Sequence, residues 1–411
     1  MKRLLRSLIL QCVRIFGAPR ASLATRWAAR RGTPRQREPR ILLVRPDHLG
    51  DLVLTTPVLQ ALKTQAPQAH LTMMVGSWSR SVVERHPSLD RLITCPFPGF
   101  QRAPQHPLAP YALLLRTARQ LRRERYDLAI NLRPDFWWGA ALLYLAGIPH
   151  RIGYDIAPGT PFLTRALPFP SPEHATVSNL RLASAGLQAL GYPALDEPYT
   201  PARYPLQFTP ASEERAWVSS RLEGAGINAQ TPVVVIHPGT GGSVKLWRSE
   251  GWTHIANLLT TSSPTPAHIV LTGSPQERSM LEEIAQGTSS APLLVTDASV
   301  GQLTALLGRA QLVLGVDSGP LHLAVSQDTL TLQIFGPTDA RIFGPWGTLE
   351  KHIVIASTQR CATCPTIPCG RLDFRPEELP DHPCVRCISE QQVTQAITSL
   401  VSTLPSYPPG R

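Results

Sequence analysis

The chain has 411 residues, of which 43% are hydrophobic and 17% are charged, and its formal net charge is +11. This composition excludes a collagen, a coiled coil and a disordered chain, because it supplies ample apolar side chain for burial, and the length suits two domains. No apolar run reaches the ~20 residues that a membrane-spanning helix requires, so we do not expect an integral membrane protein.

The positive charge is concentrated in an N-terminal arm, residues 1–40. The arm holds eleven Lys or Arg residues and one acid, Glu38, which gives it a net charge of +10, and the rest of the chain carries +1. A nucleic-acid-binding fold would carry its charge on the folded body. The charge distribution therefore predicts no nucleic-acid partner.

Apolar residues recur at helical spacing within the arm, between basic ones. They are Leu4, Leu5, Leu8, Ile9, Val13 and Phe16. A basic amphipathic helix can lie in a membrane interface with its cations near anionic headgroups, so the arm is predicted to contact an anionic membrane surface. A disordered arm and a signal peptide are the alternatives. Arg14 interrupts the apolar stretch and no convincing cleavage site follows, which argues against the signal peptide.

From residue 41 onward, short aliphatic runs alternate with segments of helical periodicity. We expect strands at 41–44, 71–76, 127–132 and 151–153, with helices between them at 52–65, 79–86, 110–126 and 139–147. Strands that alternate with helices are typical of a parallel α/β sheet. Residues 41–205 are therefore predicted to form one Rossmann-like domain.

A Pro-rich, non-periodic stretch follows, and within it residues 206–230 are predicted to be the linker. A second series then starts, with strands expected at 233–239, 268–273, 293–298, 312–319 and 329–336, and helices at 251–261, 276–285, 300–310 and 389–404. Residues 231–411 should form a second Rossmann-like domain. The predicted fold is α/β, with two doubly wound sheets facing across a cleft in which ligands bind at the carboxyl ends of strands.

The first expected strand runs into a turn that ends in Gly50 and Asp51 at the start of a helix. Gly50 allows a ligand to approach the backbone closely. Asp51 suits two roles, an N-cap of the helix or a catalytic base, and the turn alone leaves both open.

The second series opens with a strand that ends in a glycine-rich loop, 237–242, followed by Lys245. Flexible backbone N–H groups in such a loop can cradle a diphosphate. The loop is not a Walker A motif, because Val244 and Leu246 flank the lysine where that motif requires Gly and Ser or Thr. No GxGxxG sequence follows the first strand of either series, which disfavours a dinucleotide-dependent dehydrogenase.

Asp317, Ser318, Gly319 and Pro320 lie between an expected strand and a helix. The free N–H groups in the first turn of that helix suit a phosphate. His322 lies on the same turn, where a single histidine is as often structural as ligand-binding.

Four segments occur together in order, namely ILLVRPDHLGDLVLTTPVLQALK, HPGTGGSVKLW, LTGSPQER, and GVDSGPLHLA with IFGPTDARIFGPWG. Over roughly residues 41–400 the chain thereby resembles glycosyltransferase family 9, the ADP-heptose:lipopolysaccharide heptosyltransferases and their relatives. The resemblance implies a GT-B fold and an inverting, metal-independent transfer of a sugar, heptose, from an ADP-linked donor to a lipopolysaccharide or related saccharide. It also implies a cytoplasmic enzyme, peripheral at the inner face of the bacterial inner membrane, that requires no cofactor for catalysis.

The same resemblance implies roles for individual residues. Asp51 matches the catalytic base. The donor-binding positions are Gly50, Thr240, Gly241, Lys245, Asp317, Ser318, Gly319 and His322. The alternative is a catalytically silent nucleotide-sugar-binding protein of the same fold, and the presence of both Asp51 and Lys245 favours the enzyme.

The chain departs from the family pattern at two positions that bear on donor identity. Pro275 stands where some heptosyltransferases carry an acid, with Glu277 two positions further on. Gly241 replaces the second Thr of the phosphate loop.

Five of the seven cysteines crowd into residues 361–387 in the pattern C-x2-C-x4-C-x14-C-x2-C. The odd total, in a chain without a convincing export signal, argues against a disulfide framework. The two CxxC pairs, Cys361 with Cys364 and Cys384 with Cys387, predict a structural zinc site. The alternative is a loop with five reduced thiols.

Overall fold

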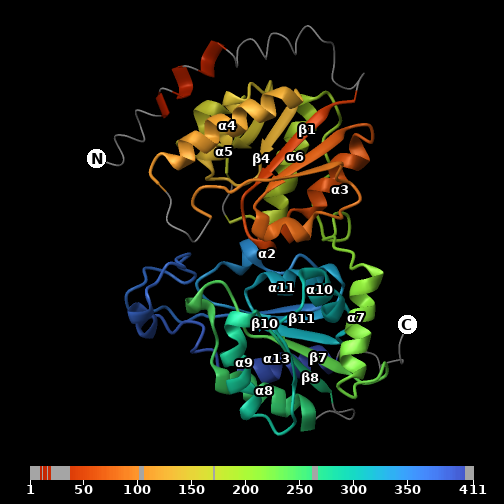
Figure 1. The fold of residues 1–411 in the computed structure, drawn as a ribbon. Coiled ribbons are helices and arrows are strands. Elements are labelled where there is room, and N and C mark those ends of the chain that lie inside the picture. Colours follow the sequence, from red (N-terminus) through yellow and green to blue (C-terminus); the bar gives the residue numbers. More distant parts are fainter. Residues whose placement is uncertain are drawn as a thin grey trace. The chain divides into compact units, whose positions relative to one another are not determined.

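The computed structural model (Figure 1) describes residues 10–11, 13–15, 17–19, 38–100, 106–169, 172–261 and 267–402. The chain forms two compact units, Met1–Thr200 and Pro201–Arg411. Each unit is described by itself below.

Within its described residues the first unit contains a six-stranded parallel sheet in the order β3-β2-β1-β4-β5-β6. Its strands are β1 (Arg40–Arg45), β2 (His70–Val75), β3 (Arg91–Thr94), β4 (Leu128–Asn131), β5 (His150–Tyr154) and β6 (Arg165–Leu167). Its helices are α2 (Leu49–Val53), α3 (Thr56–Gln65), α4 (Ala109–Glu124), α5 (Trp137–Leu145) and α6 (Ala175–Ala189), with 3₁₀ helices η2 (Ser77–Val82) and η3 (Thr160–Phe162). This is the doubly wound order, with the switch point between β1 and β4.

The described part of the second unit repeats the plan, with the order β12-β11-β10-β7-β8-β9. Its strands are β7 (Val233–His237), β8 (His268–Thr272), β9 (Leu293–Val295), β10 (Leu312–Val316), β11 (Leu330–Phe335) and β12 (His352–Ala356). Its helices are α7 (Ser212–Glu223), α8 (Ser249–Thr261), α9 (Arg278–Gln286), α10 (Val300–Arg309), α11 (Gly319–Ser326), α12 (Ala340–Phe343) and α13 (Glu390–Ser402), with 3₁₀ helices η4 (Ser243–Lys245), η5 (Pro275–Glu277) and η6 (Pro376–Asp381). The switch point lies between β7 and β10.

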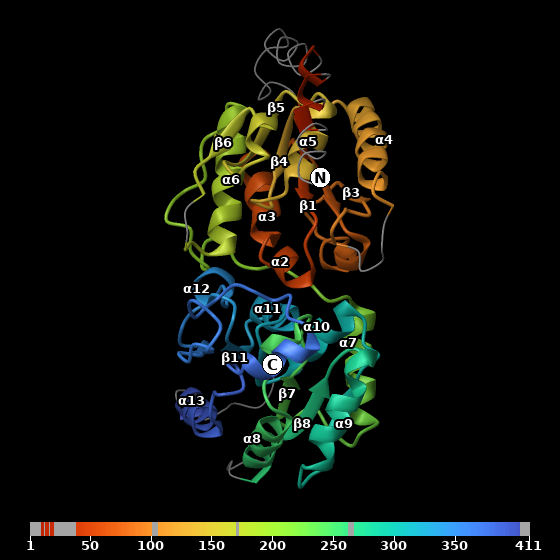
Figure 2. The ribbon, with the colours of Figure 1, turned by 90° about the vertical axis from the view of Figure 1, so that its left-hand side faces the viewer.

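Helices cover both faces of each sheet, as Figure 2 shows. In the first unit α3 packs against α6, and α4 packs against α5; in the second, α10 packs against α7 and α11, and α8 against α9 and α13. The central strands are consequently buried along their whole length, as parallel strands covered on both faces should be. The predicted α/β fold of two doubly wound sheets is confirmed. Residues 206–230, predicted as the linker, contain α7.

The helix predicted at 52–65 is in fact two helices, because the chain breaks between α2 and α3. Pro57 lies in the first turn of α3, where its missing N–H costs nothing. In a helix continued from α2, its ring would clash with the carbonyl four residues earlier, so the helix breaks before it. Side chains of α6 form hydrogen bonds with the polar groups at the break. Thr176 Oγ1 donates to the Leu54 carbonyl at 3.0 Å, and Asn179 Nδ2 donates to Thr55 Oγ1 at 3.2 Å. The helix predicted at 79–86 is likewise replaced by the shorter η2.

Residues 10–11, 13–15 and 17–19 of the N-terminal arm are helical, and this part of the arm packs on the first unit. Leu10 and Val13 contact its core, and Tyr144 Oη donates to the Arg14 carbonyl at 2.9 Å. The other apolar positions of the predicted membrane face, Leu4, Leu5, Leu8, Ile9 and Phe16, lie outside the described residues. In the described part of the chain, no helix is both long enough and apolar enough to span a membrane.

Acid is expected to destabilise the second unit through its buried histidines. Burial lowers the pKa of His352 to about 4, and burial also lowers the pKa of His237. Each histidine therefore contributes stability that is complete above the unfolded pKa of about 6.5 and is lost as the pH falls toward 4. The loss is up to about 1.4 kcal/mol per histidine for each pH unit in that window.

Urea denaturation at several pH values between 7 and 4 measures this loss. His352 Nδ1 contacts Thr331 Oγ1 at 3.1 Å, a contact that the neutral amide of His352→Gln can replace. The variant should lose less stability on acidification than the wild type. An identical pH dependence in both proteins would contradict the assignment.

Candidate active site

Asp51 lies just beyond the carboxyl end of β1, at the switch point of the first sheet. The N-cap of α2 is His48, and Asp51 is the third residue of the helix, so it is not an N-cap. Its side chain is 32% exposed, and Arg45 Nη2 donates to its Oδ1 at 3.4 Å. Gly50 precedes it within the same short helix. The structure thus excludes an N-cap role for Asp51. It shows a partly exposed carboxylate beside the buried guanidinium of Arg45.

Arg45 is fixed by contacts with three other parts of the first unit. Its Nη1 donates to the carbonyl of Leu132, which follows β4, at 2.9 Å, and to Asn179 Oδ1 of α6 at 3.1 Å. Its Nε lies 2.7 Å from Asp47 Oδ2. A guanidinium held at so many points has little freedom to rotate. Its positive charge therefore stays in one position beside the carboxylate of Asp51.

A second arginine, which is partly exposed, joins the charge group of Arg45, Asp47 and Asp51. Arg133, in the loop after β4, pairs with Asp47 and, at 2.7 Å, with Asp135. Burial lowers the pKa of Arg133, but the carboxylates of Asp47 and Asp135 raise it more, so the net shift is upward. Asp47 is almost fully buried between the two guanidinium groups, which is the pairing that a buried carboxylate requires.

Aromatic rings lie next to this charge group. The rings of Trp78 and Phe100 stack, with centroids 6.4 Å apart and planes at 10°, and His48 lies about 6 Å from both. Trp78 Nε1 donates to the Asp47 carbonyl at 3.1 Å, which fixes its indole beside the turn that carries Asp51. The guanidinium of Arg133 lies over the Phe100 ring at 5.1 Å. We call His48, Trp78 and Phe100 the aromatic wall.

In the second unit, Lys245 and Asp317 meet at the switch point of the sheet. Lys245 Nζ donates to the Asp317 carbonyl at 2.8 Å and pairs with Asp317 Oδ2 at 3.1 Å. Two hydroxyls reinforce the pair, because Thr240 Oγ1 donates to the Asp317 carbonyl and Thr338 Oγ1 donates to its Oδ2. The ammonium group is therefore held at the carboxyl ends of β7 and β10.

Ser318 is the N-cap of α11, and Gly319 is the first residue of that helix. The buried Ser318 hydroxyl has no hydrogen-bond partner among the described residues. A buried hydroxyl without a partner is costly, so this atom is poised for a ligand at the helix N-terminus. His322 is buried on the same helix.

Glu277 contacts the glycine-rich loop. A Cβ on Gly239 would overlap the carboxylate of Glu277, so a larger residue there would displace the Glu277 side chain. Glu277 Oε2 accepts hydrogen bonds from the backbone N–H and the hydroxyl of Ser274. Glu277 thus reaches the loop of Thr240. Gly241 has open space on its Cβ side, with nothing within 4 Å.

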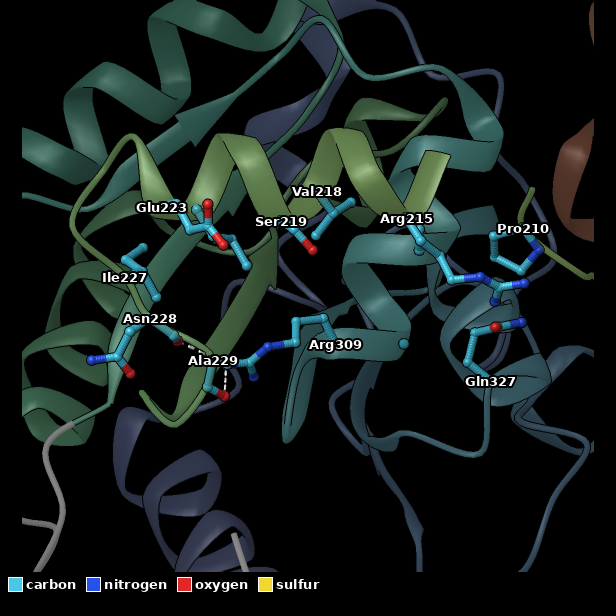
Figure 3. A pocket seen from close by; sticks show the side chains of 13 residues that line it. Pro210, Arg215, Val218, Ser219, Glu223, Ile227, Asn228, Ala229, Arg309 and Gln327 are labelled. Atoms are coloured by element: carbon cyan, nitrogen blue, oxygen red, sulfur yellow. Dashed lines mark hydrogen bonds between the residues drawn. The ribbon is translucent and has the colours of Figure 1, made fainter. Parts of the chain in front are cut away.

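A pocket of about 330 Å³ in the second unit contains none of these residues. Figure 3 shows that it lies between α7, α10 and the loop after α7. The guanidinium of Arg309 in this pocket binds the protein backbone, because its Nη2 donates to the carbonyls of Asn228, Ala229 and Thr231. We therefore give the pocket no part in the active site.

The cysteine cluster lies in the second unit, where Cys361, Cys364 and Cys384 are buried in the core. Cys387, the fourth member of the predicted zinc set, is exposed. His382, which the spacing argument did not include, lies beside Cys364.

Sequence reasoning also missed Arg45, Asp47, Arg133, Asn179, the aromatic wall and Thr338. The Arg-Pro-Asp of residues 45–47 was a usable pattern, because two opposite charges at the end of a buried strand can pair with each other. Asn179 and Thr338 carry no such pattern in their surroundings.

The family model of glycosyltransferase family 9 (heptosyltransferase) matches residues 114–370. Lipopolysaccharide heptosyltransferase 3 of Escherichia coli is 28% identical over 306 residues, which are 72% of this chain and 83% of that protein. A glycosyltransferase family 9 structure from Veillonella parvula aligns with a TM-score of 0.68 and 22% identity, covering 89% of this chain and 98% of that one. The structure of an Escherichia coli heptosyltransferase with ADP aligns with a TM-score of 0.63 and 20% identity, covering 88% of this chain and 99% of that one.

The family match covers more than half of the chain, and the solved structures share its two doubly wound sheets. The chain therefore belongs to glycosyltransferase family 9, the heptosyltransferase family, and is a glycosyltransferase.

Proposed function

We propose that the chain transfers a heptose from an ADP-linked donor to a lipopolysaccharide or related saccharide, with inversion at the anomeric carbon. The observation that carries the proposal is the group at the switch point of the second sheet, where Lys245, the N-terminus of α11 and the unpartnered Ser318 hydroxyl come together. An ammonium group and free backbone N–H groups are what a diphosphate requires. The similarity to an Escherichia coli heptosyltransferase with ADP supports adenine as the base.

In the proposed reaction Asp51 takes the proton of an acceptor hydroxyl as that oxygen forms its bond to the anomeric carbon. The bond from the anomeric carbon to the diphosphate breaks in the same step, and ADP leaves with the electron pair. Lys245 and the N–H groups of α11 stabilise the charge that develops on the departing phosphate. These groups suffice for the displacement, so we propose no cofactor for catalysis.

The aromatic wall and Arg133 supply an acceptor surface beside Asp51. The C–H face of a sugar ring packs on aromatic rings, and a guanidinium pairs with carboxylate or phosphate groups on a lipopolysaccharide core. Arg45 keeps Asp51 paired with a cation while the acceptor binds. The relative named lipopolysaccharide heptosyltransferase 3 supports an acceptor of this class.

A transfer assay tests the proposal. The full chain is incubated with ADP-heptose, UDP-glucose or GDP-mannose and with a panel of truncated, deacylated lipopolysaccharide cores; nucleotide release and product mass are measured, and NMR gives the anomeric configuration. We expect heptosylated product from ADP-heptose with an inverted anomeric centre. Donor binding without transfer to any core would instead favour the silent nucleotide-sugar-binding protein.

We further propose that the arm, residues 1–40, holds the enzyme on the anionic cytoplasmic face of the inner membrane. Replacing Lys2, Arg3 and Arg6 by Gln leaves Leu10 and Val13 packed on the first unit. At about 1 kcal/mol per basic residue, the change should weaken binding to phosphatidylglycerol vesicles by about 100-fold. Vesicle flotation measures the binding.

A matched control neutralises three exposed arginines on the folded body, Arg116, Arg119 and Arg123 of α4. We expect this variant to bind vesicles like the wild type. An equal loss in both variants would move the membrane contact from the arm to the body.

A further inference from the structure

The segment between β12 and α13, residues 357–389, is irregular apart from η6 (blue loops in Figure 1). Its buried apolar residues are few, and three of them are cysteines. A stretch of this length with so small a core cannot hold its conformation by hydrophobic burial alone. Segments of this kind are commonly held by a disulfide or a bound metal.

Three donor atoms in this segment converge. The Sγ atoms of Cys361 and Cys364 and a ring nitrogen of His382 all lie within 4.8 Å of one another, and the residues are buried. His382 Nδ1 lies 3.3 Å from Cys364 Sγ. Ligands at about 2.3 Å (sulfur) and about 2.0–2.1 Å (nitrogen) from a tetrahedral Zn²⁺ are separated by about 3.5–3.8 Å. Among the residues that the structure describes, no other group of three or more His, Cys, Asp or Glu side chains brings its donor atoms within 4.8 Å of one another.

A fourth ligand is available on the buried side of this group. Cys384 lies beside Cys361 and is 2% exposed. Cys369 also lies beside Cys364 but is only half-buried, and Cys387 is exposed. Burial and contact therefore favour Cys384, which gives a three-sulfur, one-nitrogen set of the kind that structural zinc sites use.

The segment supports both loops of the proposed donor site. Trp247, two residues beyond Lys245, donates from Nε1 to the Ile388 carbonyl at 2.9 Å. The Gly370 N–H donates to the Pro337 carbonyl at 2.7 Å, next to the Thr338 that binds Asp317. A Cβ on Gly336 would overlap Val385 Cγ2, so this loop and the segment are in close contact.

We propose that Cys361, Cys364, Cys384 and His382 bind one Zn²⁺ ion that fixes residues 357–389 against the core of the second unit and thereby holds the loops of Lys245 and Asp317. The site replaces the exposed Cys387 of the spacing pattern by His382. It goes beyond the transfer reaction, because it predicts metal content whichever donor the enzyme uses.

Elemental analysis of the full chain tests the proposal. The protein is purified under reducing conditions without a polyhistidine tag, from medium that contains zinc and iron. We expect about one zinc per chain in the wild type and in the matched variants Cys387→Ser and Cys369→Ser. Cys384→Ser and His382→Gln should lose most of the metal. Loss of zinc in Cys387→Ser with retention in His382→Gln would overturn the ligand set.

A measurement on the unsubstituted chain covers the case in which the cysteine variants fail to fold. Zinc is removed with a chelator under reducing conditions and replaced by Co²⁺. Intense visible bands of tetrahedral Co²⁺ with thiolate charge transfer in the near ultraviolet should appear, and the metal-free protein should melt several degrees lower and bind ADP more weakly. A chain that contains no metal and takes up no Co²⁺, or a Cys361–Cys384 disulfide found by mass spectrometry, would overturn the site. One equivalent of iron would overturn the assignment to zinc.

Discussion

Asp51→Asn is expected to lower the turnover number by about 10²–10⁴-fold, because an amide cannot take the proton of the acceptor hydroxyl. The substitution keeps the shape of a side chain that is 32% exposed, and Arg45 retains its contacts with Leu132, Asn179 and Asp47. The fold and ADP binding should therefore be unchanged. Steady-state ADP release with a core acceptor measures turnover, and calorimetry measures the dissociation constant of ADP.

Asp90→Asn is the matched control, since Asp90 is a carboxylate of the same unit with a similar exposure, 34%, that also pairs with a cation, Lys63, outside the site. It should retain wild-type turnover. Arg45→Met separates positioning from proton transfer: it leaves the carboxylate of Asp51 in place and removes the cation that orients it, so turnover should fall by less than in Asp51→Asn. Turnover above about a tenth of the wild-type value in Asp51→Asn would show that another group accepts the proton.

The two sheets could be predicted because a parallel strand buried on both faces must be a continuous apolar run. The central strands β1, β4, β7 and β10 all have this pattern. The strands that the sequence did not reveal are edge strands. β3 and β6 are short and partly exposed, and β12 is only half-buried, so none of them needs an uninterrupted apolar sequence.

The site was less predictable than the fold, because its geometry depends on contacts between distant residues. The positions of Asp51, Lys245 and Asp317 followed from the turn and loop patterns and from the family resemblance. The hydrogen bond between Arg45 and Asn179 joins residues 134 positions apart, and no local pattern indicates it. His382, a ligand in the proposed zinc site, was not predicted for a related reason. Zinc spacing rules favour the second CxxC pair, whereas the fold buries His382 and exposes Cys387.

Lys245→Met is expected to weaken ADP binding by about 10–100-fold, because a hydrogen bond to a charged group contributes about 1.5–3 kcal/mol. Adenosine has no phosphate, so its affinity should change by less than about twofold. Turnover should fall as well, since charge on the departing diphosphate grows in the transition state, where one lost donor costs about 10²–10³-fold. Asp317 keeps its hydrogen bonds from Thr240 and Thr338 in the variant, so the loop should hold its conformation.

Lys351→Met provides the control for Lys245→Met, because it also removes an ammonium group paired with an aspartate of the second unit, Asp328, but at a more exposed position. We expect it to bind ADP and adenosine like the wild type. Calorimetric titration of both ligands against the three proteins gives the comparison. If Lys245→Met lost affinity for adenosine as much as for ADP, the lysine would be acting on the nucleoside or on the loop, and the diphosphate would have to be held by the N-terminus of α11 and Ser318 without it.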